Sequence, residues 1–167
     1  MPIGDMDLLQ AVRKIADYQF GKGAGKKLFP DEVSFTISKK TGRVKQIHYE
    51  GELIATLNPT SGLLCLTVEG AKRLATKDEV KPGWVKIRDE VASFVENGSD
   101  VFAKHVVDAD EEIRPMEEVI VLNSSNEVIA VGKAVLSGIE MRLFTKGVAV
   151  RVRRGRSEKT KKEKDAK

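Results

Sequence analysis

The sequence predicts an α+β fold built from two small modules. Residues 6–20 carry apolar side chains at helical spacing, and residues 33–68 alternate apolar and polar side chains between turn signals. Residues 84–154 then contain several further short strands with short helices between them. A chain of 167 residues is long enough for two modules of roughly 80 residues each, a size near the lower limit for an independent core. We therefore expect two small packed modules.

The first element is one amphipathic helix over residues 6–20. Its apolar residues recur every three or four positions: Leu8, Leu9, Val12, Ile15, Ala16 and Phe20. Asp5 or Asp7 is placed to cap the N-terminus of this helix, and Gly21 is placed to end it.

A glycine-rich basic stretch, GKGAGKKLFP, follows at residues 21–30. It ends in Gly25-Lys26, which invites comparison with a Walker phosphate loop. Such a loop needs a preceding strand, four residues between its glycines, and Ser or Thr after the lysine, and none of these is present. A flexible turn is the simplest interpretation, and a basic loop in which Lys22, Lys26 and Lys27 contact an RNA phosphate is an intermediate one.

Residues 33–68 predict a meander of about four antiparallel strands: VSFTIS, VKQIHY, LIATL and LLCLTV, joined by turns at KKTGR, EGE and NPTSG. A short helix is expected over residues 69–76. The acidic segment DEVKPG after it is the predicted boundary. We therefore expect a first domain at residues 1–79, a second at 80–155 and a basic disordered tail at 156–167.

The second module begins with a predicted strand at 84–87. A helix follows, with Val91, Phe94 and Val95 as its apolar positions, Asp89 as its cap, and Asn97-Gly98 at its end. The segment SDVFAKHVVDAD, residues 99–110, predicts one strand with Val101 and Ala103 on one side and Phe102 and Lys104 on the other.

Two more strands are expected on either side of a turn at residues 123–126, the second being the alternating run 128–136. Gly132 lies inside that run, where glycine marks a bulge or the close approach of another backbone. A Ser137-Gly138 break leads to a short amphipathic helix over residues 139–144, and the last strand is the alternating run 148–154. Gly147 is expected to serve as the C-cap of that helix.

The charge of the chain is unevenly distributed. The net charge is +4, but residues 151–167 contain nine Lys and Arg and three Asp and Glu. Residues 1–150 contain twenty and twenty-two, so they are slightly acidic. The last strand and the tail should therefore form a basic edge to which a polyanion can dock.

Catalytic and metal-binding patterns are missing from the sequence. Cys65 is the single cysteine, which excludes an intrachain disulfide and a multi-cysteine zinc site, and it is expected to be a small buried apolar residue. The two histidines, His48 and His105, lie in different modules without ligand-type neighbours. The adjacent carboxylates 111–112 and 117–118 would point to opposite faces of a strand. We expect no active site, no metal and no cofactor.

No stretch approaches the ~20 apolar residues needed to cross a bilayer, and the acidic start lacks the features of a signal peptide. The single cysteine is compatible with a reducing compartment. A cytoplasmic protein without membrane contact is expected.

The C-terminal half resembles a PUA domain, a small RNA-binding pseudo-barrel. The resemblance rests on AVGKA, SGIEM and GVAVRVRRG, in that order and spacing, and on SDVFAKHVV at residues 99–107. It implies a β pseudo-barrel with short helices and a role in RNA binding. The glycine-containing strand, the short helix and the last strand would together hold the acceptor-stem end of a tRNA.

The N-terminal half also carries a resemblance. RKIADYQFGKGAGKKLFP and the later GLLCLTVEGAKRL are similar to the domain that precedes the PUA domain in archaeal tRNA-guanine transglycosylases, which insert the archaeosine precursor into tRNA. Together the two resemblances cover about residues 6–155. In that family an N-terminal α/β barrel with an aspartate nucleophile and a cysteine-rich zinc site does the chemistry, and this sequence has neither the length nor the cysteines for it.

These observations predict a non-catalytic RNA-binding protein of the PUA class. RNA binding needs cations that reach phosphates, exposed backbone amides and a ring for stacking. The candidate residues are Lys104, His105, Gly132, Lys133, Ser137, Gly138, Arg151, Arg153 and Arg154, while Arg156 and the tail lysines would add non-specific attraction. Each charged residue also has a simpler interpretation as solvated surface.

The leading hypothesis is a tRNA-binding accessory or separate subunit in archaeosine formation, with a catalytic transglycosylase as its partner. One alternative is a PUA protein associated with the ribosome or with translation. A second alternative is a small enzyme that uses the loop at residues 21–27 to bind a nucleotide.

Overall fold

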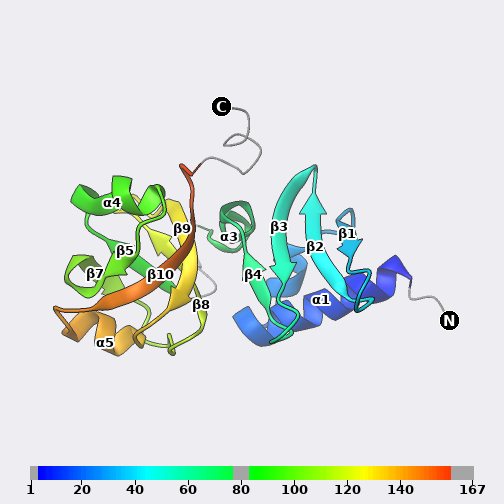
Figure 1. Cartoon of the computed structure of the whole chain (residues 1–167), viewed down its shortest axis with the longest axis horizontal. Helices are drawn as coiled ribbons and strands as arrows, with labels where there is room; N and C mark the ends of the chain where they lie inside the picture. Colours follow the sequence, from blue (N-terminus) through cyan, green and yellow to red (C-terminus); the bar gives the residue numbers. More distant parts are fainter. Residues whose placement is uncertain (1–3, 77–82, 159–167) are drawn as a thin grey trace. The chain divides into compact units, whose positions relative to one another are not determined.

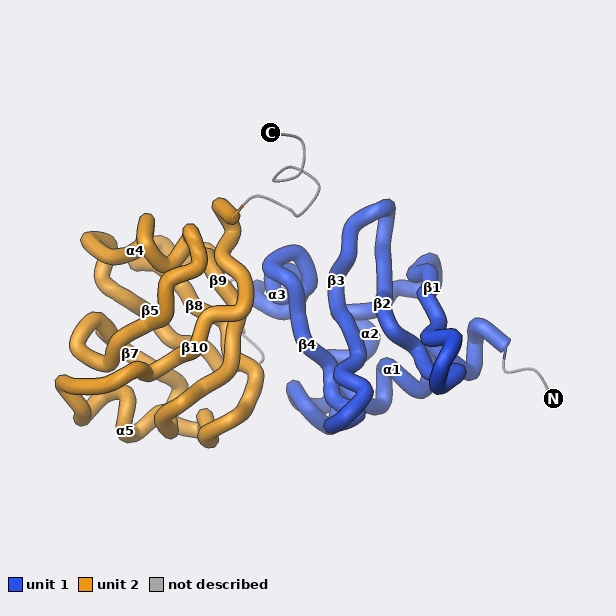
Figure 2. Tube along the Cα trace, in the orientation of Figure 1, with its two compact units in different colours: residues 1–82 blue, residues 83–167 orange. Residues whose placement is uncertain are grey.

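The computed structural model describes residues 4–76 and 83–158. The chain divides into two compact units, residues 1–82 and 83–167, which Figure 2 colours separately. The predicted boundary segment at 78–83 lies almost wholly outside the described residues, and the predicted domain limits remain a prediction. Each unit has its own sheet and its own core.

Unit 1 is a four-stranded antiparallel sheet with three helices (Figure 1). In chain order its elements are α1 (Asp5–Phe20), α2 (Ala24–Leu28), β1 (Ser34–Ile37), β2 (Val44–Tyr49), β3 (Glu52–Leu57), β4 (Leu64–Leu66) and α3 (Val68–Leu74). The strand order is β1-β2-β3-β4, so every strand pairs with its sequence neighbour. The predicted meander is confirmed.

The long helix α1 buries the stripe that its sequence spacing predicts. Leu9, Val12, Ala16 and Phe20 are at most 6% exposed. The Gln19 side chain joins the helix to β4, since its Nε2 donates to the Leu64 carbonyl at 2.8 Å and its Oε1 accepts from the Leu64 amide at 2.9 Å. Gly21 ends the helix with φ 108°, as predicted, but the N-cap is Gly4 rather than an aspartate.

The glycine-rich stretch is not only a flexible turn, because it contains the helix α2. Gly25 lies so close to α1 that a Cβ there would be 2.4 Å from the Arg13 carbonyl oxygen. Its amide donates to Asp17 Oδ1 at 2.7 Å. The glycine is therefore needed for helix packing, and its amide is already bonded inside the protein.

Unit 2 is a six-stranded sheet with short helices. Its elements are β5 (Trp84–Ile87), α4 (Asp89–Glu96), β6 (Val101–Phe102), a 3-10 turn η1 (Ala103–His105), β7 (Val106–Ala109), β8 (Glu118–Leu122), β9 (Val128–Ala134), α5 (Gly138–Leu143) and β10 (Val148–Gly155). The strand order is β6-β10-β9-β8-β5-β7, and β5 and β8 form its one parallel pair among the described residues.

The segment 99–110 is not one strand, as the alternation predicts, but two strands separated by η1. β6 pairs with β10 at one edge of the sheet and β7 pairs with β5 at the other edge. Three residues of η1 can span only about 10 Å. The two edges must therefore lie close together, so the sheet curls into a nearly closed barrel. This closure confirms the predicted α+β class and the pseudo-barrel.

The core of unit 2 is aliphatic, with Val85, Val119, Val121, Ile129 and Val150 fully buried. The helix α4 contributes Val95 to this core, but Phe94, which its spacing places among the apolar core positions, is 63% exposed. Of the predicted apolar face of α5, only Met141 is buried.

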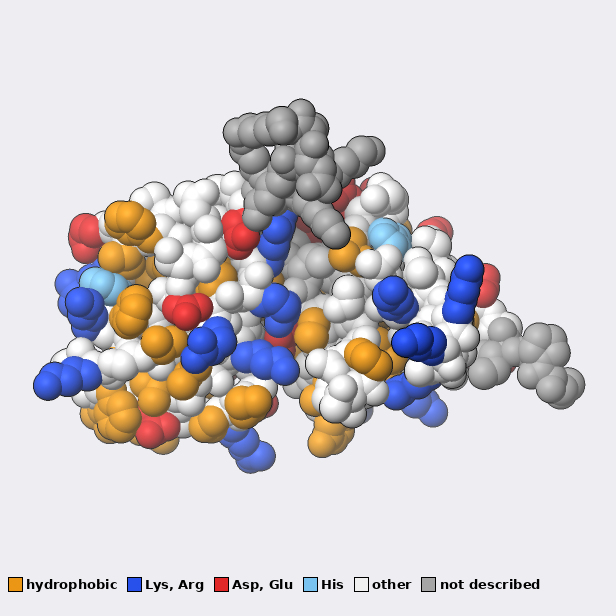
Figure 3. Space-filling model, viewed as in Figure 1, with side chains coloured by type: hydrophobic (Ala, Val, Ile, Leu, Met, Phe, Trp, Pro, Cys, Tyr) orange, Lys and Arg blue, Asp and Glu red, His pale blue; other side chains and the backbone are white. Residues whose placement is uncertain are grey.

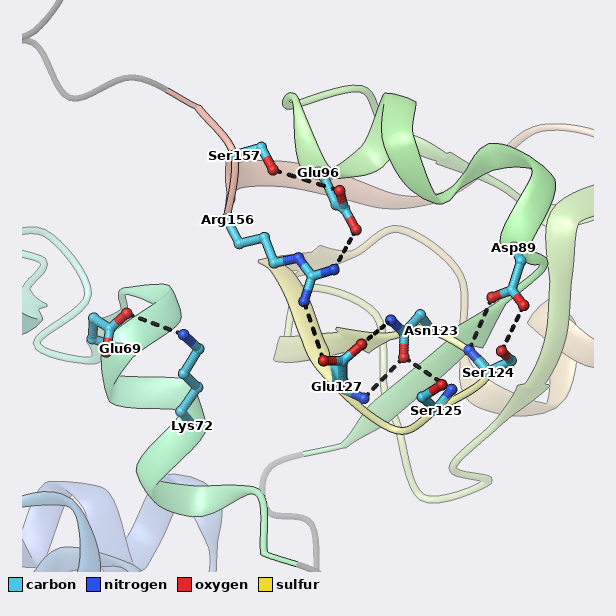
Figure 4. Close-up of polar contacts among 10 residues, drawn as sticks. All are labelled: Glu69, Lys72, Asp89, Glu96, Asn123, Ser124, Ser125, Glu127, Arg156 and Ser157. Carbon is cyan, nitrogen blue, oxygen red and sulfur yellow. Dashed lines mark hydrogen bonds and ion pairs between the residues drawn. The ribbon is translucent and has the colours of Figure 1, made fainter.

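Two predicted caps in unit 2 are wrong. The N-cap of α4 is Arg88, and Asp89 instead binds the turn after β8 by accepting hydrogen bonds from the Ser124 hydroxyl (2.6 Å) and amide (3.2 Å) (Figure 4). These two bonds hold the pKa of Asp89 below its ordinary value. Gly147 lies beyond the end of α5, in the turn before β10, where its φ is 90°.

The residues directly after β10 are held against α4. Arg156 lies between Glu96 at 2.7 Å and Glu127 at 3.8 Å (Figure 4). The Ser157 amide donates to the Glu96 carbonyl at 2.9 Å. The lysines of the predicted tail, from residue 159, lie outside the described residues. Over residues 4–76 and 83–158, no helix has the length and apolarity to cross a membrane.

Candidate RNA-binding surface

Three strands of unit 2 place charged side chains side by side on one face of the sheet. Arg151 of β10 lies opposite Lys133 of β9, and Lys133 lies opposite Glu118 of β8. Partners that face each other across neighbouring strands point to the same side of a sheet. We call Lys133 and Arg151 the basic strip. Figure 3 shows Lys and Arg side chains gathered over β9 and β10.

Arg153, two residues beyond Arg151, is bound to a buried carboxylate. The register between β10 and β9 shifts between Val152 and Arg154, so Arg153 is the extra residue of a β-bulge. A bulge re-aims a side chain, and here the guanidinium binds both carboxylate oxygens of Glu118. The Glu118 side chain is only 2% exposed. Arg153 therefore neutralises a buried charge of the fold.

The basic strip itself is more accessible. The Arg151 side chain is 71% exposed, and its one ion pair among the described residues is a long one, 4.0 Å from Nη1 to Asp100 Oδ2. Lys133 is half-buried and forms no hydrogen bond or ion pair through its ammonium with residues 4–76 or 83–158. Both cations can therefore accept a new anionic partner without leaving a buried charge unpaired.

Arg154 does not extend the strip. Its guanidinium donates to the Glu158 carbonyl at 3.1 Å and lies 3.8 Å from the Glu158 carboxylate. Glu158 also accepts from the Gly155 amide at 2.8 Å. Arg154 thus secures the end of β10.

Three predicted site residues near the strip, Gly132, Ser137 and Gly138, have structural roles in the fold. A Cβ on Gly132 would lie 2.2 Å from the Arg151 carbonyl oxygen, so the predicted close approach of another backbone is confirmed. A Cβ on Gly138 would lie 1.9 Å from the Asp110 carbonyl oxygen. Ser137 forms a capping box with Glu140 at the start of α5. These three residues shape the surface, and their role towards RNA remains a prediction.

Lys104 and His105 lie on η1 rather than on a strand. Lys104 is exposed, and His105 lines a hollow of about 250 Å³ together with Val91, Phe94, Asp100 and Phe102. Asp100 also lies beside Arg151 and accepts from the Val152 amide at 2.9 Å. The hollow and the basic strip are therefore neighbours, linked through Asp100.

Two aromatic residues at this hollow were not among the predicted site residues. Phe94 is 63% exposed and Phe102 is 45% exposed. Exposed rings beside cations are the means by which proteins stack unpaired bases. The alternation around Val101 already indicates that Phe102 points outward, but no local signal separates Phe94 from a core residue.

No metal-binding constellation is present in the described ranges. No group of three His, Cys, Asp or Glu side chains there could hold a metal ion. Cys65 is partly exposed at β4, so its predicted burial is wrong.

Comparisons with known proteins agree with this architecture. Residues 10–81 match the patch-forming domain C2 of tRNA-guanine transglycosylase, and residues 83–156 match the PUA domain. The tRNA-guanine(15) transglycosylase of Methanothermobacter thermautotrophicus is 43% identical over 151 residues, which are 90% of this chain and 23% of the relative. The corresponding protein of Pyrococcus furiosus is 44% identical over 148 residues, 89% of this chain and 25% of the relative. The chain thus spans about a quarter of the length of these relatives.

Solved structures share the fold at low identity. A hypothetical protein of Pyrococcus horikoshii OT3 has a TM-score of 0.74 at 21% identity, and the match covers 95% of each chain. A PUA domain protein of Thermoplasma acidophilum has a TM-score of 0.66 at 18% identity, with 98% of this chain and 96% of that one covered. The chain therefore carries a match to the C2 domain of tRNA-guanine transglycosylase followed by a match to the PUA domain, and it is similar to the C-terminal region of the archaeal enzymes.

Proposed function

We propose that this chain is an RNA-binding protein of tRNA modification that performs no chemistry itself. The observation that carries the proposal is the basic strip of Lys133 and Arg151 beside a hollow with two exposed phenylalanines. Cations on neighbouring strands suit the phosphates of an RNA backbone, and the rings suit unpaired bases. Because the chain is similar to tRNA-guanine transglycosylases, we propose that the bound RNA is tRNA.

Within tRNA, we propose the acceptor stem and its single-stranded 3′ end as the bound region. The strip would hold the backbone while Phe94 and Phe102 stack the unpaired 3′ bases. A duplex end alone offers no unpaired bases to the hollow, because paired bases are already stacked. This assignment makes binding depend on the 3′ end, which can be removed.

We further propose that a catalytic transglycosylase domain on a separate chain supplies the chemistry of archaeosine formation. The proposal is supported by the similarity of this chain to the C-terminal region of tRNA-guanine transglycosylases.

The test is a gel shift of tRNA over a salt series, with full-length tRNA and with a transcript that lacks the 3′ end. Lys133→Ala plus Arg151→Ala is expected to lower the log-log salt slope by about 1.5, because each lost phosphate contact removes roughly 0.7–0.9. Lys14→Ala plus Lys72→Ala removes the same charge from exposed positions on α1 and α3 of unit 1 and is the matched control.

The wild type should bind full-length tRNA more tightly than the trimmed transcript. Equal, salt-sensitive binding of every RNA that the strip variant does not change would mean that the basic tail is responsible and the strip is not. Loss of binding in the control variant as well would point to net charge rather than to the strip.

A further inference from the structure

Among the described residues, those of unit 1 have an excess of basic over acidic side chains. The described part of this unit contains eleven Lys and Arg and eight Asp and Glu, whereas that of unit 2 contains eleven and thirteen. The excess is concentrated in the β1–β2 hairpin. Between Val33 and Tyr49 the chain carries Lys39, Lys40, Arg43 and Lys45 and no acidic residue.

The hairpin turn holds its cations in fixed positions. The Ser38 amide donates to the Arg43 carbonyl at 2.8 Å, and the Gly42 amide donates to the Ser38 carbonyl at 2.8 Å. The Thr41 hydroxyl accepts from the Arg43 amide at 3.2 Å. Gly42 has φ 72°, a conformation that favours glycine. A turn with this many internal bonds does not need to be ordered by a ligand, so binding there costs little conformational entropy.

A β-bulge between β1 and β2 sets the position of Lys45. The register between β1 and β2 passes from Thr36 opposite Gln46 to Ile37 opposite Val44, which leaves Lys45 as the extra residue of a bulge. Lys45 is exposed, as are Lys39, Lys40 and Arg43. None of these four forms an ion pair with residues 4–76 or 83–158. Figure 3 shows Lys and Arg side chains gathered over β1 and β2.

A hollow of about 260 Å³ opens between this hairpin and the β3–β4 turn. Its lining includes Arg43, Lys45, Ser38, Thr41, Gln46 and Thr56. The guanidinium of Arg43 reaches the β3–β4 turn, since a Cβ on Gly62 would lie 3.3 Å from Arg43 Nη2. Two cations, three hydroxyls and an amide therefore line one hollow, and residues 53–68 beside it carry no charge at all.

We infer that the end of the β1–β2 hairpin is a second RNA contact, which holds the sugar-phosphate backbone of the RNA bound by unit 2. Cations and hydroxyls bind phosphate oxygens, and hydroxyls and amides bind ribose. No aromatic ring lines the hollow, so it offers no platform for a base and reads no sequence. The inference rests on the proposed function, because the two contacts act on one RNA.

Two RNA contacts on one protein chain bind an RNA more tightly than either contact does alone. RNA held at the basic strip is tethered to the chain that carries the hairpin, so a weak second contact adds to the total affinity more than it would for free RNA. A free phosphate or a mononucleotide has no such tether and should bind the hairpin poorly.

The test uses the full chain with Arg43→Ala plus Lys45→Ala, and Lys14→Ala plus Lys72→Ala again as the control of equal charge. The hairpin variant is expected to lower the log-log salt slope for tRNA by about 1.5. It should do so equally for full-length and 3′-trimmed tRNA, because the hairpin contacts the backbone and not the unpaired 3′ bases. The melting temperature of each variant checks that it folds.

A second readout locates the contact directly. Backbone amide resonances of Thr41, Gly42 and Arg43 are expected to shift when tRNA is added, and to stay in place with the same concentration of inorganic phosphate or adenosine monophosphate. Equal shifts with the small anions would identify an adventitious anion site and overturn the inference.

The outcomes separate the two proposals. If the strip variant weakens tRNA binding but the hairpin variant matches the control and its amides do not move, the inference fails and the proposed function stands. If the wild type binds no RNA, both fail.

Discussion

Arg151 and Arg153 are two residues apart on β10, and their side chains have different partners. Arg151 is 71% exposed beside Asp100, whereas Arg153 binds the buried carboxylate of Glu118. Alternation along a strand predicts that both lie on the same face of the sheet. The bulge at Arg153 and the buried glutamate on β8 decide their different roles, and neither is visible in the local sequence.

Arg153→Ala should therefore act on stability more than on RNA binding. Removal of the guanidinium takes away the two hydrogen bonds that Arg153 makes to a buried carboxylate, which costs on the order of 2 kcal/mol because the pair is partly screened by solvent at the arginine. Urea denaturation measures this loss. Glu118→Gln plus Arg153→Ala should recover part of it. A variant of unchanged stability that no longer binds tRNA would instead identify Arg153 as a direct RNA contact.

At the scale of elements, α5 depends on its capping box. The helix has only six residues, too few to be stable by themselves. The Ser137 hydroxyl accepts from the Glu140 amide at 3.2 Å, and the Glu140 carboxylate accepts from the Ser137 amide at 2.9 Å. Hydrogen bonds from the Ser137 amide and then its hydroxyl hold the pKa of Glu140 below its ordinary value of 4.5.

The smaller, side-chain part of this lowered pKa predicts a pH-dependent effect of Ser137→Ala, because alanine keeps the backbone amide that donates to Glu140. A carboxyl with a lower pKa in the folded state stabilises the fold above its unfolded pKa, and this contribution is lost as the pH falls through the folded value. At pH 7 we expect a melting temperature lower by about 4 °C, and a smaller difference from the wild type once the pH falls below the lowered pKa of Glu140. Thermal melts at several pH values measure it. Ser93→Ala, at an exposed position of α4, is the control, and a constant difference at every pH would contradict the role of Glu140.

At the scale of the whole molecule, each unit closes its own core. In unit 2 the last strand, β10, lies between β6 and β9, so the sheet is complete only when the C-terminal strand is in place. The turn η1 then brings the two sheet edges together. A barrel of this kind has its buried residues on every strand, from Val85 to Val150.

Residues 83–158 are therefore expected to fold alone, although about 76 residues is near the lower limit for a single core. A dispersed NMR spectrum and one cooperative urea transition would bear this out. A truncated form of residues 83–147 lacks β10 and should remain unfolded, because the loss of β10 separates β6 from β9. A folded truncated form would show that the closure of the sheet is not what stabilises the unit.

Much of the fold follows from local pattern. Helical spacing predicts α1, strand alternation predicts the meander, and a glycine inside β9 predicts the close approach of β10. These signals work because they depend only on the period of the backbone and on steric exclusion. The turn η1 and the short helix α2 could not be predicted from periodicity, since elements of three to five residues are too short to show a repeating pattern.

The sequence by itself determined the two modules, their class and the residue types of a nucleic-acid surface. Only the tertiary structure decided which of those residues are available to RNA. Arg153 and Arg154 bind partners within the protein. Phe94 is exposed although its helical spacing predicts a core position, and four cations lie together at the end of one hairpin. The physical reason is that a side chain's freedom depends on what lies across the sheet or across a turn, and those neighbours are distant along the chain.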